Sequence, residues 1–239
     1  MAASDPTAHE DVLVLRIAAA ASRAADGPAR TDRGPDPRVA RTRAAVAEAA
    51  TTLFLRNGYQ GTSVDEIAAL ARVSKRSVYN NFADKQTLFT ELVLGYTATA
   101  EDFAGRLVAD LPDATDVPAA IRDLARRHLQ AVARPQVLRL RRLIILEAAR
   151  FPDLAAEYYR RAPGRVISAL TEAFQLLHAR GELNAPDPQQ AAEHYSYLVL
   201  GATLDTALFN PDAPTPPEQE LQRTAEHGAN AFLAAYRPA

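Results

Sequence analysis

The side chains best suited to specific hydrogen bonding lie together in one short stretch, Lys75–Phe82. With helical periodicity, Val78 and Phe82 are four residues apart and can anchor this stretch in a core. The residues left to point outward are Lys75, Arg76, Ser77, Tyr79 and Asn80. Arginine can pair with guanine O6 and N7, asparagine with adenine N6 and N7, and lysine and tyrosine can reach phosphates. The pattern is typical of a helix that reads the major groove of DNA.

Other short elements have to position such a helix. Ser63 and Glu66 have the spacing of a capping box, which predicts a helix that starts there and ends near Arg72. Only Arg72-Val73-Ser74 precedes the reading stretch, and Ser74 can cap it. Two short helices joined by a turn of about three residues must cross steeply. The sequence therefore predicts a helix-turn-helix.

Longer helices are predicted on both sides of this unit. One runs from about Arg38 to Asn57, and Gly58 follows where a left-handed cap is needed. Asp84 is expected to cap a fourth helix, about Asp84–Ala109. From Arg38 onward every long segment has helical periodicity, prolines separate the segments, and no sustained strand pattern occurs. We therefore predict an all-α fold.

Length, composition and charge agree with this organisation. The chain has 239 residues, 48% of them hydrophobic and 23% charged, which suits a small and a larger packed domain. We expect an N-terminal extension over residues 1–37 that is mobile, a three-helix DNA-binding domain over 38–94, and a larger helical domain over 95–239. The net charge is −2, but residues 30–85 carry ten Lys and Arg against six Asp and Glu, a balance of +4, and the remainder carries −6. The basic segment coincides with the predicted DNA reader.

Several classes of protein are excluded or disfavoured. Cysteine is absent, which excludes disulfides and thiolate sites, and the five histidines show no metal-ligand spacing. No apolar run approaches the roughly 20 residues of a membrane span, so we expect a cytoplasmic protein with no membrane partner, no metal and no cofactor. The alternative of an all-α enzyme lacks a nucleophile–base pair, a phosphate loop and a metal set. We therefore expect no catalytic residue.

The residues of the reader also carry a resemblance. The strings Gly58–Ala68 and Val73–Phe82, followed by Asp84-Lys85 and Leu88-Phe89, closely resemble the N-terminal domain of TetR-family transcriptional regulators. The similarity covers roughly Arg41–Leu94. One departure is Asn81, where the family often has histidine, although asparagine can still donate to a phosphate.

The resemblance implies a homodimer that binds a near-palindromic operator in double-stranded DNA and usually represses; activation stays open as an alternative. By position, it implies that Lys75, Arg76, Ser77 and Asn80 approach bases. It implies that Thr62, Tyr79, Asn81 and Lys85 hold phosphates. Arg38, Arg41 and Arg43 either touch the DNA backbone or minor groove or are solvated linker charge.

The larger half resembles, more weakly, the C-terminal domain of an AefR-like branch of the family, which implies an unknown small-molecule effector. Glu147 lies on an apolar helical stripe, so it contacts either the ligand or Arg150 three residues later. Other candidates for the pocket wall, which could equally be core, are Phe103, Phe151, Phe174, Tyr195 and Tyr197. Because these walls carry few charges, we expect an apolar or amphipathic ligand.

The last two long helices, about Asp187–Phe209 and Pro217–Tyr236, look like the dimerisation pair of the family. Small residues on them could let helices of two subunits approach closely, and intramolecular packing is the alternative. These residues are Gly201, Ala202, Ala207, Gly228, Ala229 and Ala231.

Overall fold

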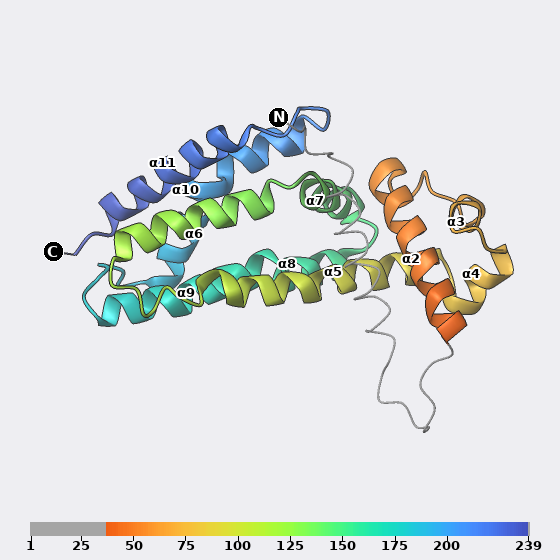
Figure 1. Cartoon of the computed structure of the whole chain (residues 1–239), viewed down its shortest axis with the longest axis horizontal. Coiled ribbons are helices and arrows are strands. Elements are labelled where there is room, and N and C mark those ends of the chain that lie inside the picture. The colour runs from red at the N-terminus through yellow and green to blue at the C-terminus, as the bar shows by residue number, and fades with distance from the viewer. Residues whose placement is uncertain (1–36, 239) are drawn as a thin grey trace, which may run out of the picture. The chain divides into compact units, whose positions relative to one another are not determined.

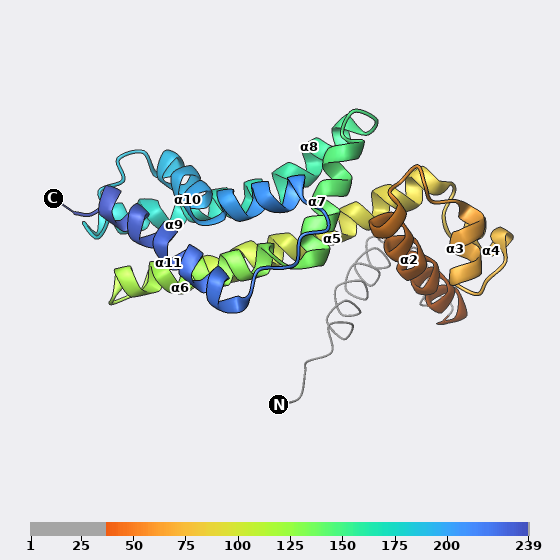
Figure 2. The ribbon, with the colours of Figure 1, turned by 90° about the horizontal axis from the view of Figure 1, so that it is seen from above.

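A computed structural model describes residues 37–238 of the chain, shown in two views in Figures 1 and 2. These residues form ten helices and contain no strand. The predicted all-α fold is therefore confirmed. The N-terminal extension expected over residues 1–37 lies outside the described residues, except for Pro37.

The described chain divides into two compact units. The first combines residues 37–100 with 143–158, and the second combines residues 101–142 with 159–238. Each unit is therefore discontinuous in sequence.

Three helices of the first unit form the expected helix-turn-helix arrangement. They are α2 (Pro37–Asn57), α3 (Val64–Leu70) and α4 (Lys75–Asn81), and each packs against the other two. Figure 1 shows them in orange and yellow at the start of the coloured chain. The first part of α5 (Lys85–Val108) completes the unit together with the end of α7 (Pro135–Glu147) and most of α8 (Pro152–Arg161).

Local side-chain caps explain why the short helices begin where they do. The Ser63 hydroxyl accepts from the Glu66 backbone N–H, and the Glu66 carboxylate accepts from the Ser63 N–H at 2.8 Å, so the predicted capping box is present. The Ser74 hydroxyl caps α4, and Asp84 accepts from the Thr87 N–H at 2.7 Å at the start of α5. These caps bond backbone N–H groups that a helix start leaves unpaired.

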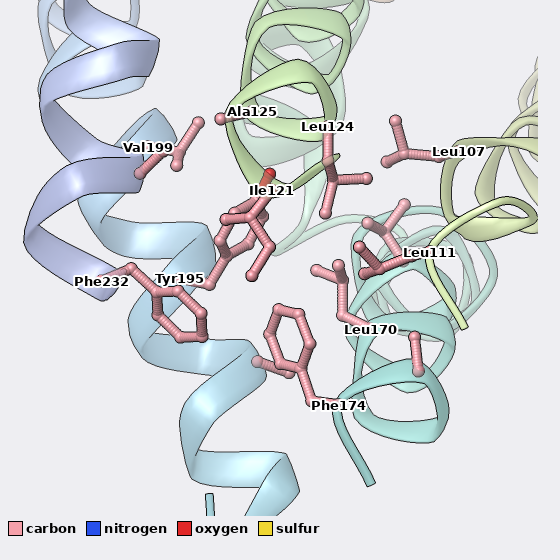
Figure 3. Packing of buried hydrophobic residues seen from close by; sticks show 14 of the residues in the cluster. Leu107, Leu111, Ile121, Leu124, Ala125, Leu170, Phe174, Tyr195, Val199 and Phe232 are labelled. Atoms are coloured by element: carbon pink, nitrogen blue, oxygen red, sulfur yellow. The ribbon is translucent and has the colours of Figure 1, made fainter. Parts of the chain in front are cut away.

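Four helices form the core of the second unit. They are α6 (Val117–Val132), α9 (Pro163–Ala179), α10 (Pro188–Phe209) and α11 (Glu218–Ala235). Helix α10 packs against the other three, and α11 also packs against α6. Figure 3 shows the apolar side chains that meet between them. Phe174, Tyr195 and Phe232 are its largest rings, each 0% exposed. Burial of each such side chain stabilises the unit by about 1.5–3 kcal/mol.

Candidate DNA-binding interface

Helix α4 presents a polar face on an apolar anchor. Val78 and Phe82 are each 2% exposed, which confirms the predicted anchor. Tyr79 is 47% exposed, and Arg76 and Asn80 are also exposed. Within residues 37–238 the side chains of Arg76 and Asn80 form no hydrogen bond, so both are available to a base edge.

The Lys75 side chain is exposed, but it already forms an ion pair. Its Nζ donates to the Asp65 carboxylate at 3.0 Å, which joins the starts of α4 and α3. This hydrogen bond raises the pKa of Lys75, and the charge of Asp65 adds to the shift. A phosphate or base that binds the Lys75 ammonium group therefore competes with Asp65.

Two other residues expected at the DNA also support α4. Ser77 lies at the capped start of the helix, with its hydroxyl 2.8 Å from that of Ser74. The Asn81 side chain donates to the Ser77 carbonyl at 2.8 Å, and the Asn81 carbonyl accepts from Arg43. Asn81 therefore holds one end of the helix as well as lying near its surface.

Arg43 has a structural role that the sequence did not indicate. Its guanidinium pairs with Glu91 of α5 and donates to the Asn81 carbonyl. It also lies over the Phe82 ring, 4.1 Å from the centroid. These contacts fasten the end of α4 to α2 and α5, so Arg43 is neither a free DNA contact nor solvated linker charge.

Lys85 fastens the loop that follows α2. Its Nζ donates to the carbonyls of Tyr59 and Thr62, both at 2.9 Å, and lies 4.3 Å from the Tyr59 ring centroid. Burial lowers the pKa of Lys85, and the nearby Arg150 lowers it further. A lysine ammonium has three donors, so one N–H remains for a phosphate.

Thr62 belongs to the same loop. It is 1% exposed, and its hydroxyl donates to the Gly58 carbonyl at 2.8 Å. The hydroxyl can donate to a phosphate only if that bond breaks. The role that the structure shows for Thr62 is to close the loop.

A cluster of four rings supports the loop from the other side. Tyr59 lies against Phe54, Phe89 and Phe151, with centroid distances of 5.8, 5.0 and 4.9 Å. Phe151 belongs to the turn between α7 and α8, and it also lies 5.5 Å from Phe89. A residue predicted to line the ligand pocket therefore packs on the DNA-binding segment.

Arg150 adds polar contacts at the same place. Its Nε lies 3.5 Å from the Glu147 carboxylate, so the pairing with Arg150, one of the two alternatives for Glu147, is present in the structure. With its amide oxygen turned toward the guanidinium, Gln60 accepts from Arg150 Nε at 3.0 Å. Glu147, through Arg150, and Phe151 therefore both pack in the first unit beside the loop after α2.

The other pocket candidates lie in the second unit. The His128 ring lies beside Phe103 and Tyr195, and Phe174 lies beside Tyr195. Nothing in the sequence pattern had singled out His128 as a site residue. Tyr197 is 76% exposed and points away from this group. We therefore leave Tyr197 out of the pocket.

The small residues of α10 and α11 divide into two groups. Gly228 and Ala229 are buried within the protomer, and a Cβ on Gly228 would lie 2.5 Å from the Leu198 carbonyl oxygen. These two residues therefore pack within one protomer, where α10 and α11 of the same chain cross. Ala202 and Ala231 are exposed, and Gly201 and Ala207 are half-buried, with the Ala207 carbonyl accepting from Arg142.

The fold and the α4 surface define an all-helical protein with a helix-turn-helix for DNA. A sequence profile of bacterial regulatory proteins of the tetR family matches residues 46–92, and that of the AefR-like transcriptional repressor C-terminal domain matches residues 119–238. The chain belongs to the TetR family of transcriptional regulators. It is a regulator and not an enzyme.

Relatives that span most of the chain agree with this assignment. A solved structure described as a TetR-family transcriptional regulator from Mesorhizobium loti is 35% identical, with a TM-score of 0.76, over 84% of this chain and 100% of that chain. The flavonoid-responsive regulator FrrA is 30% identical, with a TM-score of 0.61, over 83% of this chain and 98% of that chain. The HTH-type transcriptional regulator YezE of Bacillus subtilis is 26% identical over 62% of this chain and 76% of its own length.

Residues 37–238 contain neither a candidate membrane span nor a candidate metal site. No helix in this range is long and apolar enough to cross a bilayer. No three His, Asp or Glu side chains in the same range form a group that could hold a metal ion.

Proposed function

We propose that the protein is a repressor that binds a near-palindromic operator as a homodimer and leaves it when a small molecule binds the second unit. The observation that carries this proposal is the exposed polar face of α4, anchored by Val78 and Phe82. The match of residues 119–238 to the C-terminal domain of AefR-like repressors supports repression in preference to activation.

The α4 side chains divide by their chemistry. Arg76 and Asn80 contact base edges, because they are exposed and bear bidentate groups. Tyr79 and the third N–H of Lys85 contact phosphates, and Lys75 does so in competition with Asp65. Ser77 and Asn81 lie at the same surface, and together with the buried Thr62 they mainly hold it in shape.

The homodimer forms through the exposed face of α10. Tyr197 and Gly201 are four residues apart and lie one above the other on the helix, and Phe209 follows at the end of the same helix. Tyr197 is 76% exposed and Phe209 is 83% exposed, which leaves large apolar side chains for a second copy to cover. Ala202 and Ala231 flank this face as small residues. Two reading helices then lie about 34–36 Å apart, one turn of DNA.

The effector binds among the aromatic side chains of the second unit. The walls are Phe103, Phe174 and Tyr195, which favours an apolar or amphipathic molecule. The flavonoid-responsive relative FrrA supports an aromatic effector. Release requires that the ligand prefer the chain conformation with the weaker affinity for DNA.

Operator selection followed by footprinting tests the proposal. Fragments of the source genome are selected by the full-length protein, and the bound site is mapped and placed before a reporter gene. We expect two protected half-sites about one helical turn apart and a reporter that is repressed when the protein is present. Higher expression in its presence would show an activator, and a single protected half-site bound by a monomer would contradict the dimer.

A further inference from the structure

Tyr195 and His128 each bury a polar atom in the second unit that has no hydrogen-bond partner within residues 37–238. Tyr195 of α10 is 0% exposed, and His128 of α6 is 3% exposed. Neither the Tyr195 hydroxyl nor His128 Nδ1 has a hydrogen bond within the described part of the chain. Buried polar groups in folded proteins are nearly always paired, and an unpaired one lowers stability. Phenylalanine and leucine would fill the same space without this loss.

Both groups belong to one set of rings, Phe103, His128, Phe174 and Tyr195, which we call the ring cluster. The rings of His128 and Tyr195 are nearly parallel, with 12° between planes and 6.3 Å between centroids. Phe103 lies 6.5 Å from His128, and Phe174 lies edge-on to Tyr195 at 5.7 Å. Figure 3 shows Tyr195 and Phe174 reaching from α10 and α9 into the same core. The cluster combines flat apolar faces with two unpaired polar atoms.

The charges around the cluster are positive. Burial lowers the pKa of His128 to about 4, with Arg141 adding to the shift, so the imidazole is neutral near pH 7. Burial raises the pKa of Tyr195 well above its usual value, against the effect of Arg127, so the phenol keeps its proton. Arg127 pairs with Asp123 at 2.7 Å, whereas Arg141 forms no ion pair with any residue in 37–238. Electron-rich oxygen atoms are favoured in this field, and cationic groups are not.

We propose that the ring cluster binds a planar aromatic molecule with hydroxyl substituents, whose oxygens pair with the Tyr195 hydroxyl and His128 Nδ1. This names the chemical class of the effector and so rests on the proposed function. An aliphatic chain would leave both polar atoms unpaired, and a terminal carboxylate could accept from Tyr195 but has no hydrogen to donate to His128 Nδ1. An aromatic amine cation would be repelled by the arginines. A hydroxylated ring satisfies both groups, because a phenol oxygen can donate and accept a hydrogen bond.

Binding of four matched probes to the full-length protein tests this assignment by calorimetry. The probes are biphenyl, its dihydroxylated derivative, its aminomethyl derivative and decanoate. We expect the dihydroxylated probe to bind at least about tenfold more tightly than biphenyl, a difference of about 1.4 kcal/mol. The amine and decanoate should bind more weakly than the dihydroxylated probe. Equal affinity for biphenyl and its dihydroxylated form, or no binding of either, would overturn the assignment.

The variant Tyr195→Phe isolates the hydroxyl. We expect it to remove most of the preference for the dihydroxylated probe while the affinity for biphenyl stays unchanged. Tyr159→Phe is the matched control, because that hydroxyl is on a side chain 57% exposed outside the ring cluster and its loss should leave the preference intact. Since the Tyr195 hydroxyl is unpaired, Tyr195→Phe should not lower the thermal midpoint of the unliganded protein. A lowered midpoint would mean that the hydroxyl has a structural partner, such as a buried water, and would also overturn the assignment.

Operator release separates this inference from the proposed function. If the dihydroxylated probe binds at Tyr195 but leaves operator affinity unchanged, the ligand site stands and the release function fails. If decanoate binds most tightly and releases the operator, the release function stands and the aromatic ligand class fails.

Discussion

The ring of Phe151 lies edge-on to the ring of Tyr59, with 84° between the planes and 4.9 Å between the centroids. Edge-to-face pairs at this distance contribute about 0.5–1.5 kcal/mol beyond the area they bury. The Tyr59 carbonyl also accepts a hydrogen bond from Lys85. The same loop residue therefore contacts both Phe151 in the α7–α8 turn and Lys85, which is proposed to bind a phosphate. A movement of the α7–α8 turn therefore displaces the loop after α2, whose carbonyls accept hydrogen bonds from Lys85.

The exposed residues of α4 should separate base contacts from phosphate contacts. Arg76→Ala or Asn80→Ala is expected to weaken operator binding by about 1–3 kcal/mol and to relax the preference at one base pair per half-site. Lys85→Ala should weaken operator and random DNA alike and lower the salt slope by about one unit. Competition binding at several salt concentrations measures both effects. Equal losses for all three variants on every DNA sequence would contradict the assigned roles.

The ion pair between Asp65 and Lys75 should restrain DNA binding. Asp65→Asn removes a negative charge that lies beside Lys75, so we expect tighter binding to operator and random DNA and a steeper salt dependence. Because the pair is exposed to solvent, the free energy of unfolding should change little. Lys75→Ala in the Asp65→Asn background is the control. A steeper salt dependence that survives this second change would not come from Lys75.

Dimerisation can be tested at Gly201. A Cβ there meets no other atom within 4 Å, so an added side chain fits the protomer. Gly201→Arg should place a charge in the proposed dimer face, shift the protein to monomer in sedimentation and abolish operator binding without loss of helix content. Gly201→Ala is the control and should stay dimeric. A stable Gly201→Arg dimer would contradict the proposed interface. Ala229→Leu cannot serve here, because Ala229 is 0% exposed and the change would overpack the protomer core.

Features set by neighbouring residues could be predicted from the sequence. The Ser63–Glu66 capping box, the Asp84 cap and the anchor formed by Val78 and Phe82 all depend on spacings of three or four residues. The helix pattern follows from the same local periodicity. The pairing of Glu147 with Arg150 was predictable for the same reason.

Contacts between distant segments could not be predicted in this way. Periodicity shows which face of a helix is apolar, but it does not show which other helix packs against that face. The contact of Phe151 with Tyr59, and the enclosure of Arg43 by Glu91 and Asn81, both depend on that information. His128 was missed because a lone histidine on a helix shows its significance only when its burial is known.

The burial of His128 should make stability depend on pH. Its pKa is about 4 in the folded protein and about 6.5 when unfolded, so the unfolded chain takes up a proton that the folded chain does not. The free energy of unfolding should therefore fall as the pH drops through this window, by about 3 kcal/mol in total. Urea unfolding between about pH 7 and pH 4.5 measures the loss. His128→Leu should flatten the curve, and His227→Leu, at an exposed position, should not. Parallel curves for the wild type and His128→Leu would contradict a neutral buried imidazole.

The contact of Phe151 with Tyr59 should carry part of the coupling between ligand and DNA. In the wild type, a releasing ligand must lower operator affinity by the same factor by which the operator lowers ligand affinity, about 5–150-fold in typical allosteric proteins. Phe151→Ala removes the ring between the α7–α8 turn and the Lys85 loop. We expect it to reduce this factor while each partner still binds alone. Titration of the dihydroxylated biphenyl with and without operator measures the factor, and Tyr159→Ala, at a side chain 57% exposed on α8, is the control. If the factor is large in the wild type and unchanged in Phe151→Ala, the signal takes another route. If ligand affinity in the wild type is the same with and without operator, this ligand does not release the repressor.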